Sequence, residues 1–486
     1  MRLRSYLVFS VLLGSFMISA QNKELLYDFY EIPQTLMVNP GVKTSEKWHV
    51  GIPVISGLSF QGATSGVTVN DLFANDGIDF TTKVQERVLD VMTHKDDFST
   101  TSQIEGFTIG FRGRNRPDDY YSFGVYGETD VIVYWPKDLA ILAFEGNGGN
   151  NIGRSFDLGD LKLRGEMINV FHFGVNRKMS NTLTVGARAK LYSSIFQFQS
   201  IKNSGSFRTT EGQDNIYVTS IAADMQLQTA GVKGFYDIVE EDTGTTRKDV
   251  TSLFTERVLL GGNLGLGFDA GFSYQLTPQT TITGSVLDIG FIYNSKDVWN
   301  YTFNGSTSTE GISVYLPEDI DNLDNDLWQE LIDDIDEALP HGENTSSYIS
   351  FRPVKAYGSI RYDFGEGGNN RFDNCGCGVN EQGGGSNQDF YRNSVGGQLF
   401  MMKRPRGVQA ALTGFYQKRF GRGLSLKTTY TIDKYSFTNV GLGLNLQAGP
   451  VNFYILGDNL LSYANVADSH YASLQFGFNI ISWNGN

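Results

Sequence analysis

The stretch LSLKTTYTI at residues 424–432 decides the fold, because its side chains alternate between two faces with a period of two. The same alternation recurs in VGLGLNLQA at 440–448 and in ASLQFGFNI at 472–480. Successive side chains of a β-strand point to opposite faces, so each stretch has one apolar face and one polar face. Amphipathic strands of about nine to eleven residues, separated by turn residues, are typical of a transmembrane β-barrel.

Charged side chains indicate which face of these strands points outward. Arg188, Lys190 and Lys427 lie on the polar faces, and so does Asp269. A basic side chain exposed to lipid at the bilayer midplane costs about 2–4 kcal/mol. We therefore expect the polar faces to line the interior of the barrel and the apolar faces to contact lipid. Near the C-terminus the residues expected to face lipid are Val440, Leu442, Leu444, Leu446, Leu474, Phe476 and Phe478.

Strand-like runs extend along most of the chain. They lie at 48–62, 104–113, 120–134, 161–176, 183–198, 216–229, 264–276, 281–293, 348–364, 394–403, 408–420, 424–432, 440–448, 451–461 and 472–480. Bacterial single-chain barrels have an even number of strands, and one or two of these runs fit hairpin arms outside the membrane. The sequence therefore predicts an all-β fold, a transmembrane antiparallel β-barrel of about 14 strands with long extracellular loops and a small helical insertion. A soluble sandwich or propeller is the alternative, but a blade repeat of about 40–50 residues is not present.

The N-terminal region predicts a secreted protein. In residues 1–20, Arg2 and Arg4 precede an apolar core and Ala20 closes a small-residue cleavage site, as in a signal peptide. After it, no run approaches the ~20 apolar residues that a helical span needs. Residues 21–47 are too apolar for a solvated leader and contain two prolines, which exclude a lipid-facing strand. We expect them to form an ordered periplasmic or luminal segment, with the barrel at 48–486.

Three segments lack the strand pattern. Residues 70–92 fit a short helix, 233–258 form a charged excursion, and 295–347 form the longest loop. Inside that loop, 322–339 is predicted to be an acidic amphipathic helix. Its apolar stripe consists of Leu323, Leu327, Leu331, Ile335 and Leu339. Loops of this length usually have a function or are mobile, so this one is a candidate binding surface.

Composition excludes several classes of function. The formal net charge of −14 excludes a basic nucleic-acid-binding surface. The two cysteines, Cys375 and Cys377, lie in a glycine-rich stretch without further metal ligands at metal-like spacing, so a loop-tip pair or an intermolecular thiol is expected. Four aspartates resemble a calcium loop, but the central glycine and properly spaced ligands of an EF-hand are missing. They are Asp319, Asp321, Asp324 and Asp326. We expect no catalytic, metal-binding or cofactor-binding residues.

Short motifs add a resemblance to a known superfamily. The stretch from Phe29-Tyr30-Glu31-Ile32-Pro33 to Val38-Asn39-Pro40-Gly41 resembles the mature start of Bacteroidota outer-membrane barrels, where Asn-Pro-Ala or Asn-Pro-Gly precedes the first strand. Ser285-Val286-Leu287-Asp288-Ile289-Gly290 and Leu456-Gly457-Asp458-Asn459-Leu460-Leu461 look like mid-chain and late-strand motifs of the same superfamily, which includes an uncharacterised barrel family. More remotely, the chain resembles the partner barrels of type IX secretion and gliding motility, and barrels of the fatty-acid-transporter type. Gly41 stands where alanine is commoner.

The resemblance implies a location in the cell outer membrane and favours one function. We expect a non-enzymatic accessory or partner protein in type IX secretion or surface-protein display. Its expected partners are outer-membrane lipid and lipopolysaccharide, and a secreted or surface protein bound through the 295–347 loop. The alternative is an outer-membrane transporter for hydrophobic or small solutes. An enzyme comes third, because the sequence has no Gly-x-Ser-x-Gly or His-Glu-x-x-His motif.

Overall fold

A computed structural model describes residues 23–212, 217–240, 246–310, 341–366, 391–421 and 423–482. The strands are β1 Trp48–Gly51, β2 Leu58–Thr64, β3 Asp97–Gly113, β4 Arg116–Tyr134, β5 Ser155–Asp157, β6 Leu163–Lys178, β7 Leu183–Glu211, β8 Tyr217–Ala230, β9 Asn263–Gln275, β10 Thr280–Asn294, β11 Val298–Glu310, β12 His341–Asn344, β13 Tyr348–Phe351, β14 Lys355–Glu366, β15 Tyr391–Arg404, β16 Gly407–Phe420, β17 Leu424–Ile432, β18 Asn439–Ala448, β19 Val451–Asp458 and β20 Tyr471–Ile481. The helices are η1 Pro33–Met37, α2 Val69–Phe73, α3 Phe80–Lys83, η2 Val84–Leu89, α4 Lys137–Phe144, η3 Gly149–Asn151, α5 Lys233–Glu240, α6 Thr246–Glu256, η5 Arg257–Gly261 and η7 Leu460–Asp468.

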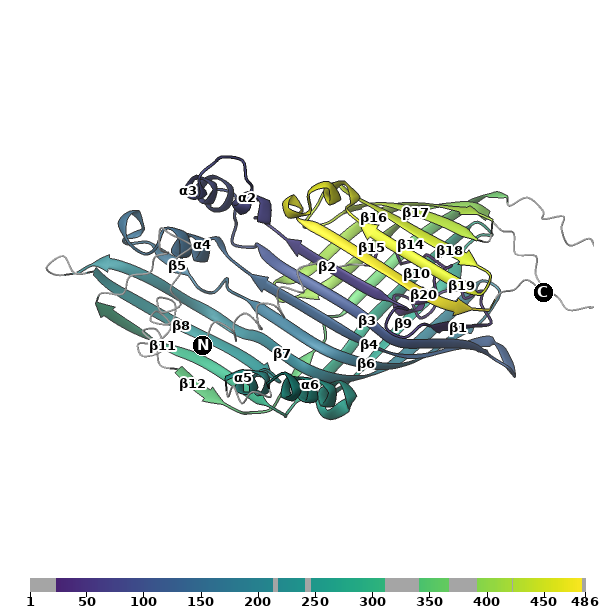
Figure 1. The fold of residues 1–486 in the computed structure, drawn as a ribbon, viewed down its shortest axis with the longest axis horizontal. Helices are drawn as coiled ribbons and strands as arrows, with labels where there is room; N and C mark the ends of the chain where they lie inside the picture. The colour runs from purple at the N-terminus through teal and green to yellow at the C-terminus, as the bar shows by residue number, and fades with distance from the viewer. Residues whose placement is uncertain are drawn as a thin grey trace, which may run out of the picture.

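The strands close into one antiparallel barrel (Figure 1). The wall runs from β1 and β2 through β3, β4, β6, β7, β9 and β10 to β13 and β14, and then through β15 to β20 in chain order. It closes where β20 pairs with β19 on one side and with β1 and β2 on the other. Because β1 and β2 form one interrupted wall strand, and β13 and β14 another, the wall has fourteen strands. The predicted fold class is therefore confirmed.

The two faces of the wall are as the alternation predicted. Along β18, the burial of side chains alternates, with Leu442 and Leu446 exposed and Asn445 buried. The four charged residues expected to face inward are all buried, at no more than 4% exposure. They are Arg188, Lys190, Asp269 and Lys427. The apolar side chains thus form the outer surface of the barrel, where lipid hydrocarbon would surround them.

The two ends of the barrel differ in the length of their connections. Short turns join β3 to β4, β6 to β7, β9 to β10 and β18 to β19 at one end, the turn end, where β1 begins and β20 ends. Most of the longer connections, including those that contain the helices α2 to α6, lie at the opposite end, the loop end, whereas residues 367–390, outside the described ranges, join β14 to β15 at the turn end. In outer-membrane barrels the short turns are periplasmic and the long loops extracellular, which gives the orientation.

At the loop end part of the sheet continues beyond the barrel. Strand β7 pairs with β9 in the wall over its first half, and its second half pairs with β8, which pairs with β11. These strands reach past the rest of the wall on the left of Figure 1. The run predicted at 216–229 is β8 and lies in this extension, and β11 occupies the start of the loop predicted at 295–347. That loop prediction was wrong at 298–310 and at 341–344, which form β11 and β12. The serine-, threonine- and asparagine-rich β11 lacks the apolar alternation of a lipid-facing strand, so the sequence pattern did not indicate it.

Helices and short loops pack together over this extension. The helix expected at 70–92 is present as α2, α3 and η2, and the charged excursion at 233–258 contains α5 and α6. The cluster of buried apolar residues consists of Val67, Val84, Val88, Leu89, Met92, Ala140, Ile141, Phe156, Phe207 and Ile221. Beside it, a hydrogen bond from Lys83 lowers the pKa of Asp76 below its ordinary value. Among the residues described, no helix is both long and apolar enough to cross a membrane.

Several sequence predictions concern residues outside the described ranges. They are the signal peptide at 1–20, the acidic helix at 322–339, the aspartates from Asp319 to Asp326, and the pair Cys375 and Cys377.

The outward orientation of Leu444 gives a test of the fold. Replacing Leu444 with Arg should impair barrel assembly, because a basic side chain facing lipid near the midplane costs about 2–4 kcal/mol. The fraction of folded protein can be measured by heat-modifiable migration in a gel. The uncharged replacement Leu444→Met serves as the control and should assemble normally. Equal assembly of both variants would contradict the outward assignment.

Candidate functional site: the plugged lumen

The described part of the N-terminal segment, residues 23–47, lies inside the barrel. Leu25, Leu26, Tyr27 and Phe29 have no exposed surface at all. They form a core with inward side chains of the wall, and the ring of Tyr27 stacks on that of Tyr357 at 4.8 Å between centroids. The barrel is therefore filled by its own N-terminal segment, which we call the plug.

The Asn-Pro-Gly turn of the plug packs directly on glycines of the wall. Gly186 in β7 and Gly271 in β9 are register neighbours. A Cβ atom at Gly186 would lie 1.9 Å from the carbonyl oxygen of Pro40, and one at Gly41 would lie 2.3 Å from the oxygen of Gly271. Backbone meets backbone here, so only glycine fits at these positions. This contact explains why Gly41 stands where alanine is commoner.

Polar side chains of the wall satisfy backbone groups of the plug. The guanidinium group of Arg188 donates to the carbonyl oxygens of Leu36 and Met37, at 3.1 and 2.7 Å. The amide of Asn176 donates to the oxygens of Pro40 and Val42, both at 2.7 Å. Because each such bond fixes a buried peptide group, the plug has a defined position in the lumen.

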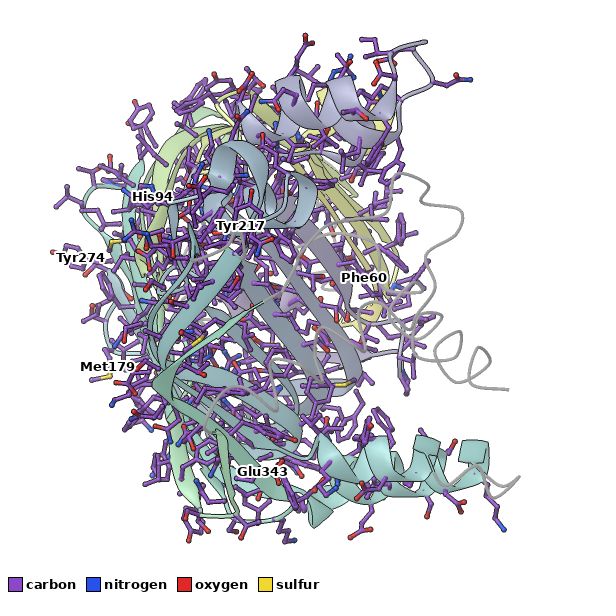
Figure 2. All side chains as sticks on the ribbon, turned by 90° about the vertical axis from the view of Figure 1, so that its left-hand side faces the viewer. Phe60, His94, Met179, Tyr217, Tyr274 and Glu343 are labelled. Atoms are coloured by element: carbon purple, nitrogen blue, oxygen red, sulfur yellow. The ribbon has the colours of Figure 1, made fainter. Side chains whose placement is uncertain are left out.

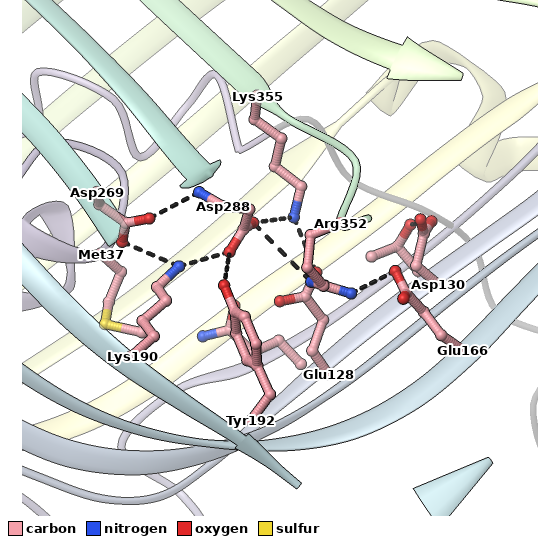
Figure 3. A network of polar contacts seen from close by, with 12 residues as sticks. Met37, Glu128, Asp130, Glu166, Lys190, Tyr192, Asp269, Asp288, Arg352 and Lys355 are labelled. Carbon is pink, nitrogen blue, oxygen red and sulfur yellow. Dashed lines mark hydrogen bonds and ion pairs between the residues drawn. The ribbon is translucent and has the colours of Figure 1, made fainter. Parts of the chain in front are cut away.

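A network of buried charges lies beside the plug (Figure 3). Asp269 of β9 binds both Arg188 and Lys190 of β7, at 2.5 and 2.9 Å. Lys190 also binds Asp288 of β10 at 2.6 Å. The hydroxyl of Tyr192 donates to the same oxygen of Asp288 at 3.4 Å. Three adjacent wall strands are thus joined by buried ion pairs.

Asp288 reaches this network because β10 has a bulge. The register of β10 with β9 shifts between Val286 and Ile289, and Asp288 has a φ of 61°. Leu287 and Asp288 consequently both point inward, although adjacent residues of a regular strand point to opposite faces. The backbone amide of Asp288 donates to Asp269 at 2.7 Å, which holds the bulge in place.

The second half of the network connects β10 to the opposite strands. Lys355 bridges Asp288 and Glu128 at 3.1 and 2.8 Å. Arg352 binds Glu128 at 3.0 Å and also pairs with Glu166. Each of the carboxylates Glu128, Glu166, Asp269 and Asp288 pairs with at least two of the cations Arg188, Lys190, Arg352, Lys355 and Arg164, the last of which lies 3.6 Å from Glu166. Opposite charges next to one another offset the cost of burying each charge.

A small cavity remains between the plug and the network. Its volume is about 50 Å³, room for about three or four water molecules. Its lining includes the charged residues Lys23, Glu128, Asp288 and Lys355. It also includes the apolar residues Leu287, Phe400, Met37 and Met402. A pocket for a small organic ligand usually measures about 300–1,000 Å³, so a larger solute requires side chains or the plug to move.

The cavity lies behind the most weakly paired part of the wall. Strand β2 pairs with β20 along its length, but with β3 it has a single register pair, Thr64 with Phe98. The next backbone contact is 2.9 Å from the amide of Glu105 to the oxygen of Gly57. In the described chain, residues 58–63 have no register partner in β3. We call residues 58–63 and the facing residues 99–104 the seam.

Side chains connect the seam to the cavity and to the plug. Ser59 of β2, and Thr101 and Gln103 of β3, line the cavity. The ammonium group of Lys23 donates to the side-chain oxygen of Gln103, so the first described residue of the plug contacts the seam directly. The hydroxyl of Thr100 donates to the carbonyl oxygen of Gln61 at 3.1 Å, which is one cross-link in place of a backbone ladder.

The charge network was not identified from the sequence. Arg188, Lys190 and Asp269 were recognised as inward residues, and Asp288 belongs to a quoted motif. Glu128, Glu166, Arg352 and Lys355 also stand on inward faces, but pairing between strands distant in the sequence gives no local signal. In the part of the chain that the structure covers, no group of three or more histidines, cysteines or carboxylates is arranged to hold a metal ion.

Fold and lumen together define a transmembrane β-barrel of the outer-membrane type whose lumen is closed by an N-terminal plug. The chain belongs to a family of unknown function, DUF5723, which matches it over residues 40–458. No curated protein matches the sequence.

Solved structures with the same type of barrel were found at low similarity. The toluene transporter TbuX of Ralstonia pickettii is 10% identical with a TM-score of 0.39, and the match covers 92% of each chain. The toluene transporter TodX of Pseudomonas putida is 10% identical with a TM-score of 0.37, covering 96% of this chain and 98% of that one. A FadL homologue of Pseudomonas aeruginosa is 9% identical with a TM-score of 0.37, covering 93% and 94%.

The balance of charge in the network gives a second test. Asp269→Asn should destabilise the barrel by about 3–5 kcal/mol, because it leaves Arg188 and Lys190 with one carboxylate too few in a buried site. The free energy of unfolding can be measured by urea titration in detergent micelles. Adding Lys190→Met removes one cation and restores the balance, so the double variant should be more stable than Asp269→Asn alone. A double variant that is less stable than either single variant would exclude charge imbalance as the cause.

Proposed function

We propose that this protein resides in the outer membrane and lets small, largely apolar solutes pass, with the seam as the opening in its wall. The observation that carries the proposal is the position of the luminal cavity directly behind residues 58–63, where β2 and β3 are held by few bonds. Opening a wall costs least where the fewest backbone hydrogen bonds must break. A solute that leaves the cavity there enters the hydrocarbon, which suits an apolar molecule.

The presence of the plug favours a route that opens and closes, and it argues against a permanently open pore. A general porin has a water-filled lumen, whereas here the N-terminal segment fills the barrel and the remaining cavity is small. The contact of Lys23 with Gln103 connects the position of the plug to the seam. Displacement of residues near Lys23 would enlarge the cavity and release this contact at the same time.

A disulfide across the seam tests the route. When the register of Thr64 with Phe98 is continued along β2 and β3, Phe60 comes to lie opposite Ser102, both on the outer face. The variant Phe60→Cys/Ser102→Cys, in a background with both native cysteines replaced by serine, should lose uptake of radiolabelled toluene when oxidised and regain it on reduction. Uptake of radiolabelled glucose, a polar solute, should be low in both states. The measurement uses whole cells of a Gram-negative host that lacks its own transporters for these solutes.

The matched control places the disulfide in an intact part of the wall. Leu399 of β15 and Leu412 of β16 are register partners on the outer face. Leu399→Cys/Leu412→Cys should take up toluene equally in the oxidised and reduced states. Equal toluene uptake by the oxidised and reduced seam variant, or rapid entry of glucose, would count decisively against the proposal.

Partnership in secretion or surface-protein display is the second candidate function. The observation that favours it is the sheet extension of β7, β8 and β11, which stands beyond the barrel at the loop end and flanks the connection at 311–340. The face of this sheet that the helices do not cover is accessible to other proteins at the cell surface. Affinity purification of the barrel from detergent-solubilised outer membrane should then recover one large secreted or surface protein in stoichiometric amount, and recovery of the barrel alone would exclude this role.

A further inference from the structure

The segment formed by α6 and η5 lies outside the barrel wall, against β6 and β7. Along β6, His172 and Asn176 point into the lumen, so Asn169 and Phe173 point outward. Phe173 is 51% exposed, as a lipid-facing side chain should be, but Asn169 is only 5% exposed. The segment η5 covers the side chain of Asn169, so η5 lies on the lipid-facing side of the wall.

Two polar side chains on the outer face of the wall are satisfied by η5. Asn169 and Ser193 are register partners on β6 and β7. The side-chain amide of Asn169 donates to the carbonyl oxygen of Val258 at 2.8 Å. The hydroxyl of Ser193 donates to the carbonyl oxygen of Arg257 at 2.5 Å. Unpaired, these groups would be costly beside hydrocarbon, where water cannot replace the missing partner. η5 thus covers two polar side chains at the edge of the apolar belt that is nearer to the loop end.

Three apolar side chains of the same segment are exposed, among polar ones such as Thr255 and Glu256. Phe254 of α6 is 37% exposed, Leu259 is 68% exposed and Leu260 is 39% exposed. Leu260 has a φ of 72°, a left-handed conformation that is unfavourable for leucine. The bonds of Arg257 to the carbonyl oxygens of Ile195 and Gly231 hold the segment on the wall despite this strain.

This apolar surface is continuous with the lipid-facing belt of the barrel. Immediately after η5, strand β9 presents Leu264, Leu266 and Phe268 on the outer face, at 44%, 58% and 46% exposure. Leu264 is the register partner of Ser193, so the belt begins directly beside the site where η5 is seated. In the view along the long axis of the molecule, the helices of the 233–256 region project sideways from the sheet, near the labelled Glu343 (Figure 2).

We propose that α6 and η5 form a membrane anchor that inserts Phe254, Leu259 and Leu260 among the acyl chains of the outer leaflet. An amphipathic segment of this kind lies at the membrane interface with its apolar side chains about 5–10 Å below the headgroups. The anchor fixes the depth and tilt of the barrel on the side of β6, β7 and β9, and it keeps water away from Asn169 and Ser193. This role is independent of what passes through the lumen.

Spin labels at single cysteines test the anchor. In a background with Cys375 and Cys377 replaced by serine, a nitroxide is attached at Leu259→Cys and the protein is reconstituted into vesicles of phosphatidylethanolamine and phosphatidylglycerol. The collision rates of the nitroxide with oxygen, which concentrates in hydrocarbon, and with a water-soluble nickel chelate are then compared. The ratio of oxygen to nickel collisions at Leu259→Cys should be several-fold higher than at an aqueous site.

Two matched sites calibrate the measurement. Leu266→Cys lies on the lipid-facing side of β9, and Tyr217→Cys lies at the start of β8, in the extension beyond the barrel, and is 46% exposed (Figure 2). All three replace exposed side chains, and heat-modifiable migration shows whether each variant is folded. A ratio at Leu259→Cys nearer to that of Leu266→Cys supports the anchor. A ratio nearer to that of Tyr217→Cys overturns it.

Discussion

Lipid hydrocarbon offers no hydrogen-bond partner to a peptide group and no solvation to a charge. The wall satisfies its backbone by closing, since β20 returns to pair with β1 and β2. The same constraint directs Arg188, Lys190 and Asp269 into the lumen, where they find partners in one another. It also explains why Asn169 and Ser193, the polar pair on the outer face, lie under the carbonyl groups of η5.

The lumen shows how a barrel of this size can do without a water-filled interior. Apolar side chains of the plug fill part of the space, and a network of ion pairs fills another part. The two are connected, because Arg188 binds both Asp269 and the carbonyl oxygen of Met37. A change in the position of the plug therefore disturbs ion pairs on the wall. Movement of the plug is limited for this reason, and it is most easily confined to residues near the cavity, where Lys23 contacts Gln103.

Two irregularities of the sheet lie near the cavity and have opposite effects. The bulge at Asp288 adds an inward charge and binds three strands together. The seam between β2 and β3 removes backbone pairs and leaves the wall held by side chains such as Thr100. The bulge stiffens the part of the wall at β10, whereas the seam weakens the part of the wall next to the cavity. A solute route at the seam is consistent with this asymmetry, because the strand pairs on either side of the seam, β2 with β20 and β3 with β4, keep their ladders.

The sequence by itself determined the barrel, its approximate number of strands and the face that each strand turns to lipid. The period of two along stretches such as 440–448 is a local property, and the cost of a charge in hydrocarbon then selects the outward face. The apolar character of Leu25, Leu26 and Phe29 likewise indicated a buried N-terminal segment. Local pattern could not reveal β11, whose polar side chains meet no lipid, nor the bulge at Asp288, where the period of two fails. Only the tertiary structure decided that Glu128, Asp288 and Lys355 meet beside one cavity and that residues 58–63 of β2 lack register partners in β3. The reason is that register and cross-barrel contacts depend on closure of the whole sheet.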